Sequence, residues 1–220
     1  MLTRREFNTG VSVVAICAVA GMPNLAFAQR ADMVPQKDLD EPSPLGDMVL
    51  GKQDAPVTII EYASMTCPHC AHFTAETFPK LKERYIDTGK VRYIFREFPL
   101  DPLAAAASML VRCGDKDKSM SLIELLFSTQ EQWAVRNPVE PLFNVVKQAG
   151  YSRENFEKCL DTRTNEDSKK ILSAIESTRN RAAEVLKVNS TPTFFINGKR
   201  LPGALSIEEL EKEIAPYLKA

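Results

Sequence analysis

The pattern of apolar and polar positions predicts two strands that flank a helix early in the chain. Residues 57–63 are apolar almost throughout and rich in β-branched and aromatic types, as is typical of a buried central strand. A helical pattern follows from residue 68 to about residue 86, and Gly89 ends it before a second strand over residues 91–98. This strand–helix–strand spacing predicts a parallel pair of strands with a right-handed crossover.

The following stretch, residues 101–186, has the periodicity of helices with start and stop signals between them. Helices are expected to begin near residues 101, 118, 138, 152 and 165. The chain then returns to a strand over residues 193–196, which a turn at Asn197 and Gly198 follows. Ser206 and Glu209 form a capping box that begins the final helix.

The first 28 residues have the three-part pattern of an export signal. Arg4 and Arg5 precede an apolar run over residues 11–20, and residues 26–28 form a small-x-small cleavage site. That run is about ten residues long, whereas a membrane-spanning helix needs about twenty. We predict export with cleavage after Ala28, by the general secretory route or by the twin-arginine route, whose signal residues 3–7 also resemble.

Charge and cysteine content narrow the class of function. The formal net charge is -1, and no basic excess points to nucleic acid as a partner. Of the five cysteines, Cys17 lies in the leader, which leaves an even number in an oxidising compartment. Cys67 and Cys70 have C-x-x-C spacing, whereas Cys113 and Cys159 lie in the helical region.

The run Thr66-Cys67-Pro68-His69-Cys70 carries the clearest chemistry, because it lies where a strand leads into a helix. With Cys67 as N-cap, Pro68 takes the first helical position, and Cys70 lies one turn along within reach of a disulfide. Free N–H groups at the helix start favour a thiolate at Cys67, and an imidazolium at His69 would strengthen this effect. Because only the reduced form contains the thiolate, the pair should be an oxidant, with Cys70 as the resolving thiol.

Two other uses of this cysteine pair stay open. A C-x-x-C can be half of a zinc site, but a structural site needs four ligands and the sequence has no second C-x-x-C. Cys67, Cys70 and His72 form at most an incomplete site for a soft metal. A purely structural disulfide in so short a ring would stabilise the fold little. We therefore expect no metal and no cofactor other than a redox-active Cys67–Cys70 disulfide.

The chain after the leader resembles the DsbA-like branch of the thioredoxin-fold oxidoreductases, periplasmic enzymes that donate disulfides to newly exported proteins. The resemblance rests on Glu61 six positions before Cys67, on the Cys-Pro-His-Cys motif, on the helical stretch and on Thr191-Pro192. It implies an α/β thioredoxin fold with a helical insertion domain, periplasmic localisation, a low pKa at Cys67 and a strongly oxidising pair. The expected parts are an extended, loosely held arm over residues 29–46, a thioredoxin domain over residues 47–100 and 187–220, and the insertion over residues 101–186.

The resemblance also implies roles for further residues. Pro192 would be a cis-proline packed against the active-site disulfide, and Thr191 would offer backbone hydrogen bonds to a substrate strand. Glu61 would be a buried acid that relays a proton as Cys70 ionises, although a surface carboxylate at the strand end is the alternative. Independently of the resemblance, we expect Met65, Pro192 and nearby apolar residues to form a shallow patch for unfolded substrate chains. For His69, an incidental first-turn residue is the alternative.

Cys113 and Cys159 depart from the simplest DsbA-like members, which have only the active-site pair. We interpret them as a structural disulfide, and two buried free thiols are the alternative. A bridge that closes a loop of about 47 residues would add roughly 4 kcal/mol of stability on the chain-entropy description.

The resulting hypothesis is a monomeric thiol:disulfide interchange protein that oxidises the cysteines of exported proteins. By the same resemblance, a DsbB-like membrane quinone reductase would reoxidise it. The alternatives are a disulfide reductase or isomerase with the same cysteines kept reduced, and a copper-binding or chaperone module.

Overall fold

The computed structural model of the protein describes residues 33–218, which belong to one compact unit, Asp32–Ala220. The predicted export signal, its cleavage site and residues 29–32 of the predicted arm lie outside the described residues. Within the described part, no helix combines the length and the apolar character needed to cross a bilayer.

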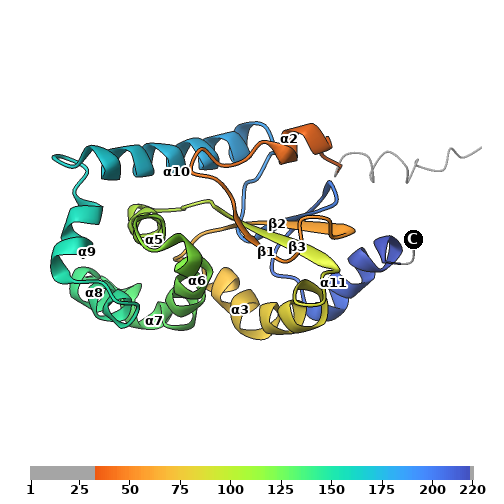
Figure 1. The fold of residues 1–220 in the computed structure, drawn as a ribbon, viewed down its shortest axis with the longest axis horizontal. Helices are drawn as coiled ribbons and strands as arrows, with labels where there is room; N and C mark the ends of the chain where they lie inside the picture. Colours follow the sequence, from red (N-terminus) through yellow and green to blue (C-terminus); the bar gives the residue numbers. More distant parts are fainter. Residues whose placement is uncertain (1–32, 219–220) are drawn as a thin grey trace, which may run out of the picture. The chain divides into compact units, whose positions relative to one another are not determined.

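A five-stranded sheet in the order β1-β3-β2-β4-β5 lies at the centre of the unit (Figure 1). β2 and β3 are parallel, which confirms the strand pairing expected from the sequence, and the other neighbours are antiparallel. β2 is buried at every position except Thr58, as expected for a central strand. The strands are β1 (Met48–Leu50), β2 (Val57–Ala63), β3 (Val91–Glu97), β4 (Thr193–Ile196) and β5 (Lys199–Pro202).

The helix after β2 is interrupted, whereas the sequence predicted one helix over residues 68–86. It consists of α3 (Pro68–Glu76), α4 (Phe78–Leu81) and η1 (Lys82–Ile86), which is a π-helical turn. The interruption lies at Thr77, two residues before Pro79. Proline has no N–H to continue the helical hydrogen bonds, and its ring crowds the preceding turn.

Helices between β3 and β4 form the inserted region. They are α5 (Pro102–Cys113), η2 (Lys116–Lys118), α6 (Ser119–Ser128), α7 (Gln130–Trp133), α8 (Val139–Gln148), α9 (Arg153–Leu160) and α10 (Glu166–Glu184). The side chains of Asp101, Ser152 and Asn165 cap α5, α9 and α10, which explains why their starts could be predicted. The final helix, α11 (Ile207–Ile214), begins with the predicted capping box, and η3 (Ala215–Tyr217) follows it.

Helices cover both faces of the sheet. Figure 1 shows α10 and α2 on one side of the sheet and α3 and α11 on the other. Two apolar clusters correspond to these sides: one joins Ile60 and Phe195 to Ala182 of α10, and the other joins Ile59 and Phe194 to helices that include α3 and α11.

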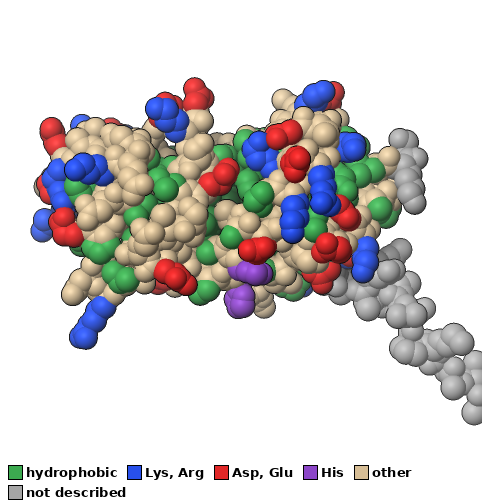
Figure 2. All heavy atoms as spheres, turned by 90° about the horizontal axis from the view of Figure 1, so that it is seen from below, with side chains coloured by type: hydrophobic (Ala, Val, Ile, Leu, Met, Phe, Trp, Pro, Cys, Tyr) green, Lys and Arg blue, Asp and Glu red, His purple; other side chains and the backbone are tan. Residues whose placement is uncertain are grey.

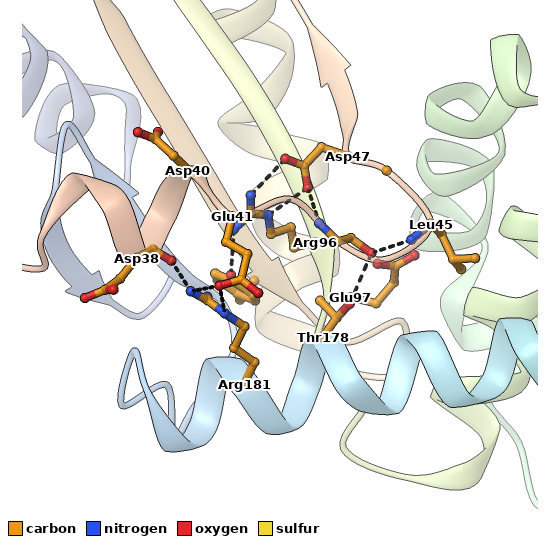
Figure 3. Close-up of polar contacts among 12 residues, drawn as sticks. Asp38, Asp40, Glu41, Leu45, Asp47, Arg96, Glu97, Thr178 and Arg181 are labelled. Carbon is orange, nitrogen blue, oxygen red and sulfur yellow. Dashed lines mark hydrogen bonds and ion pairs between the residues drawn. The ribbon is translucent and has the colours of Figure 1, made fainter.

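The segment before β1 is more ordered than the extended, loosely held arm expected from its prolines. It contains a short helix, α2 (Gln36–Asp40), whose Leu39 is 2% exposed. Arg181 of α10 donates a hydrogen bond to the backbone oxygen of Asp38 and forms an ion pair with Glu41 at 2.8 Å (Figure 3). Contacts with α10, which lies far away in the sequence, therefore hold this segment in place.

Two consecutive charged residues at the end of β3 form buried ion pairs. The guanidinium of Arg96, which is 2% exposed, donates two hydrogen bonds of 2.8 Å to the carboxylate of Asp47 (Figure 3). Glu97, which is 1% exposed, pairs with Arg112 of α5. A buried charge without a partner is costly, so each of these pairs is expected to hold its two elements together. One pair attaches the segment before β1 to β3, and the other attaches α5 to β3.

The Arg96 pair leads to a prediction about stability. Replacement Asp47→Ala leaves the buried guanidinium unpaired and should lower the free energy of unfolding by about 3 to 5 kcal/mol. Urea unfolding followed by circular dichroism measures this change. The control is Asp87→Ala, which removes an exposed ion pair with Lys82 and should cost less than about 1 kcal/mol. Equal losses in the two variants would contradict the prediction.

Candidate functional site

The two cysteines of the C-x-x-C motif lie where β2 leads into α3. Cys67 is the N-cap residue of α3, Pro68 occupies the first helical position, and the backbone N–H of Cys70 donates to the Cys67 oxygen at 3.1 Å. Both cysteines are free thiols in this structure. Cys67 is 6% exposed, whereas Cys70 is fully buried, so only the first sulfur lies near solvent.

The surroundings shift the pKa values of the two thiols in opposite directions. A hydrogen bond from the Cys70 thiol lowers the pKa of Cys67 most, against the effect of burial, and the Thr191 side chain and the backbone N–H groups of Cys70 and His69 lower it further. The pKa of Cys67 is about 5 as a result. Burial is the main reason why the pKa of Cys70 is raised, and the Cys67 sulfur and the charge of Glu61 add to it. This arrangement stabilises a thiolate at Cys67 beside a protonated Cys70.

A loop before β4 approaches the sulfur of Cys67. Its Thr191–Pro192 peptide bond is cis, and both residues are buried. The Cys67 thiol donates to the backbone oxygen of Thr191 at 3.3 Å. The hydroxyl oxygen of Thr191 is buried without a hydrogen-bond partner among the described residues, so the hydroxyl is available to the sulfur once that sulfur is ionised. The structure thus brings together residues that lie more than a hundred positions apart.

Glu61 lies inside the protein and is not a surface carboxylate. It is 1% exposed on β2, and the hydroxyl of Tyr93 donates a hydrogen bond to its Oε2, while its Oε1 has no partner among the described residues. Burial raises the pKa of Glu61 to about 8; the Tyr93 hydrogen bond lowers it, and the charge of Cys67 raises it. Near neutral pH the carboxyl is therefore mostly protonated and holds a proton beneath the cysteine pair.

His69 and Met65, which were both expected at the site, differ in their exposure to solvent. His69 is exposed, and Figure 2 shows the two histidine side chains next to each other at the surface with an acidic side chain beside them. Met65 is 1% exposed, so its side chain is not on the surface where a patch for substrate chains was expected. Met65 lies in the turn after β2, and its side chain is part of the apolar cluster that also contains Phe73 and Trp133.

Cys113 and Cys159 form a disulfide with an S–S distance of 2.10 Å and a Cα–Cα distance of 6.0 Å. The bond joins the last residue of α5 to α9. This finding excludes the alternative of two free thiols, and it places the crosslink inside the inserted region.

Two residues that contact Glu61 or the loop carrying Cys67 could not be identified from the sequence. From the sequence Tyr93 is only a strand residue. Its contact with Glu61 depends on the register of β2 and β3, in which Glu61 lies opposite Phe95, two positions from Tyr93. Gln130 of α7 donates to backbone oxygens of this loop. A single Tyr or Gln has no characteristic spacing in the sequence. The register of the two strands is the one feature that would have placed Tyr93 near Glu61.

Three features define a DsbA-like protein of the thioredoxin superfamily. They are a cysteine pair at a helix start, a cis-proline loop that faces the pair, and a set of helices inserted in the chain between two strands of the sheet. The chain belongs to the thioredoxin family, whose family model matches residues 43–215. This match confirms the predicted fold class, a thioredoxin fold with a helical insertion.

Individual relatives agree with this assignment. The chain is 37% identical over 154 residues to a Rickettsia bellii protein named as a protein-disulfide oxidoreductase, covering 69% of this chain and 57% of that protein. It is 29% identical over 187 residues to disulfide bond formation protein D of Bacillus subtilis, covering 81% and 80% of the two chains. The crystal structure of Wolbachia pipientis alpha-DsbA1 superposes with a TM-score of 0.74 at 31% identity, covering 84% of this chain and 97% of that one.

The Rickettsia relatives are longer than the matched region. The chain spans 55 to 61% of the length of these curated relatives. Residues 33–218 contain no cluster of three or more His, Cys, Asp or Glu side chains placed to hold a metal ion.

The Cys70 hydrogen bond leads to a prediction about thiolate formation. In the reduced protein, ultraviolet absorbance of the thiolate should titrate with a midpoint near pH 5. Replacement Cys70→Ala removes the donor that lowers the pKa of Cys67 most, so the midpoint should rise toward the ordinary thiol value of about 8.5. Cys70→Ser keeps a hydroxyl donor, and its midpoint should rise less. Identical midpoints in the two variants would show that this donor is not the cause.

Burial of Glu61 leads to a prediction about stability and pH. A pKa raised from 4.5 to about 8 in the folded protein contributes stability at low pH that is lost as the pH rises through this interval. Glu61→Gln cannot ionise and does not lose this stability. The free energy of unfolding of the variant, relative to that of the native chain, should therefore increase as the pH rises from 4.5 to about 8. Urea unfolding of both proteins, with the active-site pair oxidised, measures the difference. A difference that does not change with pH would contradict the buried, titrating carboxyl.

Proposed function

We propose that this chain is a thiol:disulfide oxidoreductase that oxidises the cysteines of exported proteins by donating its Cys67–Cys70 disulfide. The observation that carries the proposal is the opposite shift of the two thiol pKa values at the start of α3. Because a stabilised thiolate exists only in the reduced form, it makes the disulfide easier to reduce and the pair a better oxidant.

The reaction consists of two exchange steps. A substrate thiolate attacks the sulfur of Cys67, the Cys67–Cys70 bond breaks, and a mixed disulfide forms while the Cys70 sulfur takes up a proton. A second substrate thiolate then attacks the substrate sulfur of the mixed disulfide and releases Cys67 as a thiolate. The substrate loses two electrons, which the cysteine pair gains. A leaving thiolate of low pKa leaves faster, so the second step benefits directly from the surroundings of Cys67.

Neighbouring residues support both steps in this proposal. The buried carboxyl of Glu61 supplies the proton that Cys70 takes up, because it is protonated near neutral pH. Once ionised, its charge raises the pKa of Cys70 and so favours the protonated thiol. Thr191 and Pro192 face the attacked sulfur and offer the loop against which a substrate backbone binds. His69 is an exposed residue within the motif and contributes its backbone N–H to the stabilisation of the Cys67 thiolate.

Partners and location follow from the same assignment. The substrates are newly exported proteins with free thiols, the compartment is the periplasm, and a DsbB-like membrane quinone reductase restores the disulfide. The leader predicted from residues 1–28 and the names of the relatives support this assignment, although the Rickettsia relatives extend beyond the matched region. The protein is proposed to act as a monomer, which its mass in solution can test.

The cysteine roles can be separated by single substitutions. Cys67→Ser should abolish oxidation of a reduced substrate protein, because the attacked sulfur is absent. Cys70→Ser has no disulfide to donate, but its Cys67 thiolate should attack the disulfide of an oxidised substrate protein and release one substrate thiolate. The resulting mixed disulfide should accumulate on non-reducing gels, because the Cys70 thiol that would resolve it is absent. Turnover that survives in Cys67→Ser would sink the mechanism.

The direction of the reaction can be tested on the native chain. Equilibration with glutathione should give a reduction potential well above the roughly -270 mV of thioredoxin. A potential as low as that of thioredoxin would replace the oxidase with a reductase.

A further inference from the structure

Gln130 connects the inserted helices to the loop that carries the reactive sulfur. It is the first residue of α7 and is 7% exposed. Its Nε2 donates to the backbone oxygen of Met65 at 2.8 Å and to that of Cys67 at 3.1 Å. Both acceptors lie between β2 and α3, so one amide group bridges the two sides of the turn that presents Cys67.

The backbone oxygen of Cys67 is a sensitive place to attach this amide. The same oxygen accepts hydrogen bonds from the N–H groups of Cys70 at 3.1 Å and Ala71 at 3.2 Å, so it begins the hydrogen bonding of α3. A rotation of this peptide group would also turn the Cys67 side chain relative to the helix-start N–H groups. Hydrogen bonds weaken steeply with angle, so a small rotation would reduce the stabilisation of a charged sulfur.

The donor is held in place before any substrate arrives. Trp133, at the other end of α7, is fully buried, and its Nε1 donates to the backbone oxygen of Leu126 at 2.8 Å. Thr129, just before α7, donates from its hydroxyl to the backbone oxygen of Leu125 at 2.6 Å. The amide of Gln130 therefore extends from an anchored turn.

The two redox states depend on this contact to different degrees. In the oxidised form, a covalent bond to Cys70 holds the sulfur of Cys67. In the reduced form, only noncovalent contacts hold it, so loss of the loop contact should weaken the reduced form more.

We propose that Gln130 is a positioning residue for Cys67, whose amide holds the loop so that the sulfur faces the start of α3. Through this contact the helical insertion sets how strongly the pair oxidises its substrates. The inference rests on the proposed function of the Cys67–Cys70 pair and adds a residue that acts on the pair from outside the thioredoxin part of the fold.

The test replaces the amide by a side chain of similar length without a donor. Gln130→Met should raise the midpoint of Cys67 thiolate formation by about one pH unit, which is a tenfold smaller thiolate fraction at low pH. The equilibrium constant for oxidation of reduced glutathione by the pair should fall by about tenfold in parallel. A side chain that only stabilised the fold would change the unfolding midpoint and leave these two quantities unchanged.

The matched control is Gln132→Met, two positions along the same short helix, where the glutamine is exposed. This variant should keep the native thiolate midpoint and the native equilibrium constant. If Gln130→Met does not fold, Gln130→Asn keeps an amide in the buried site but shortens its reach, and it should shift both quantities in the same direction.

The outcomes separate this inference from the proposed function. A native chain that exchanges disulfides with glutathione, together with folded Gln130 variants that match it in both quantities, overturns the inference alone. A native chain that does not exchange overturns the proposed function, and the thiolate titration of the variants still reports whether Gln130 positions the sulfur.

Discussion

Hydrogen-bond donors around one buried sulfur oppose the cost of burying its charge, and the chemistry of the site depends on this balance. Burial alone would keep Cys67 protonated, but the Cys70 thiol and backbone N–H groups at the start of α3 lower its pKa. Cys70 lies one turn deeper, and its pKa rises because burial dominates. Two identical side chains thus differ in ionisation through position alone, and this difference suits a pair that gives its disulfide away.

The carboxyl beneath the pair shows the same competition with the opposite outcome. Glu61 has one hydrogen bond, from Tyr93, and one oxygen without a partner among the described residues, so burial prevails and the pKa rises. A buried acid with a raised pKa lowers the stability of the fold as the pH rises. Groups with such perturbed pKa values are found most often at functional sites. The ion pairs of Arg96 and Glu97, in contrast, have fully matched partners nearby.

Segments far from the motif in the sequence hold it in place. The cis Thr191–Pro192 bond brings a loop to the Cys67 sulfur, and Gln130 reaches the same loop from the insertion. Asp101 begins α5 and also accepts a hydrogen bond of 2.5 Å from Thr66, next to Cys67. The inserted helices are therefore part of the surroundings of the cysteine pair and not a separate attachment to the sheet.

Local patterns in the sequence were sufficient for β2, β3 and β4, the parallel pairing of β2 and β3, the capped helix starts and the placement of the cysteine motif, because residues close together in the chain determine these. They did not predict the edge strands β1 and β5. Local patterns did not predict the helix break near Pro79, the helical structure of α2, the burial of Met65 or the partner of Glu61. Those features depend on which side chains meet across the fold, and hydrophobic periodicity does not encode such contacts. The sequence by itself located the Cys67–Cys70 pair, whereas the tertiary structure decided how the two thiols ionise, since burial and donor geometry exist only once the chain is folded.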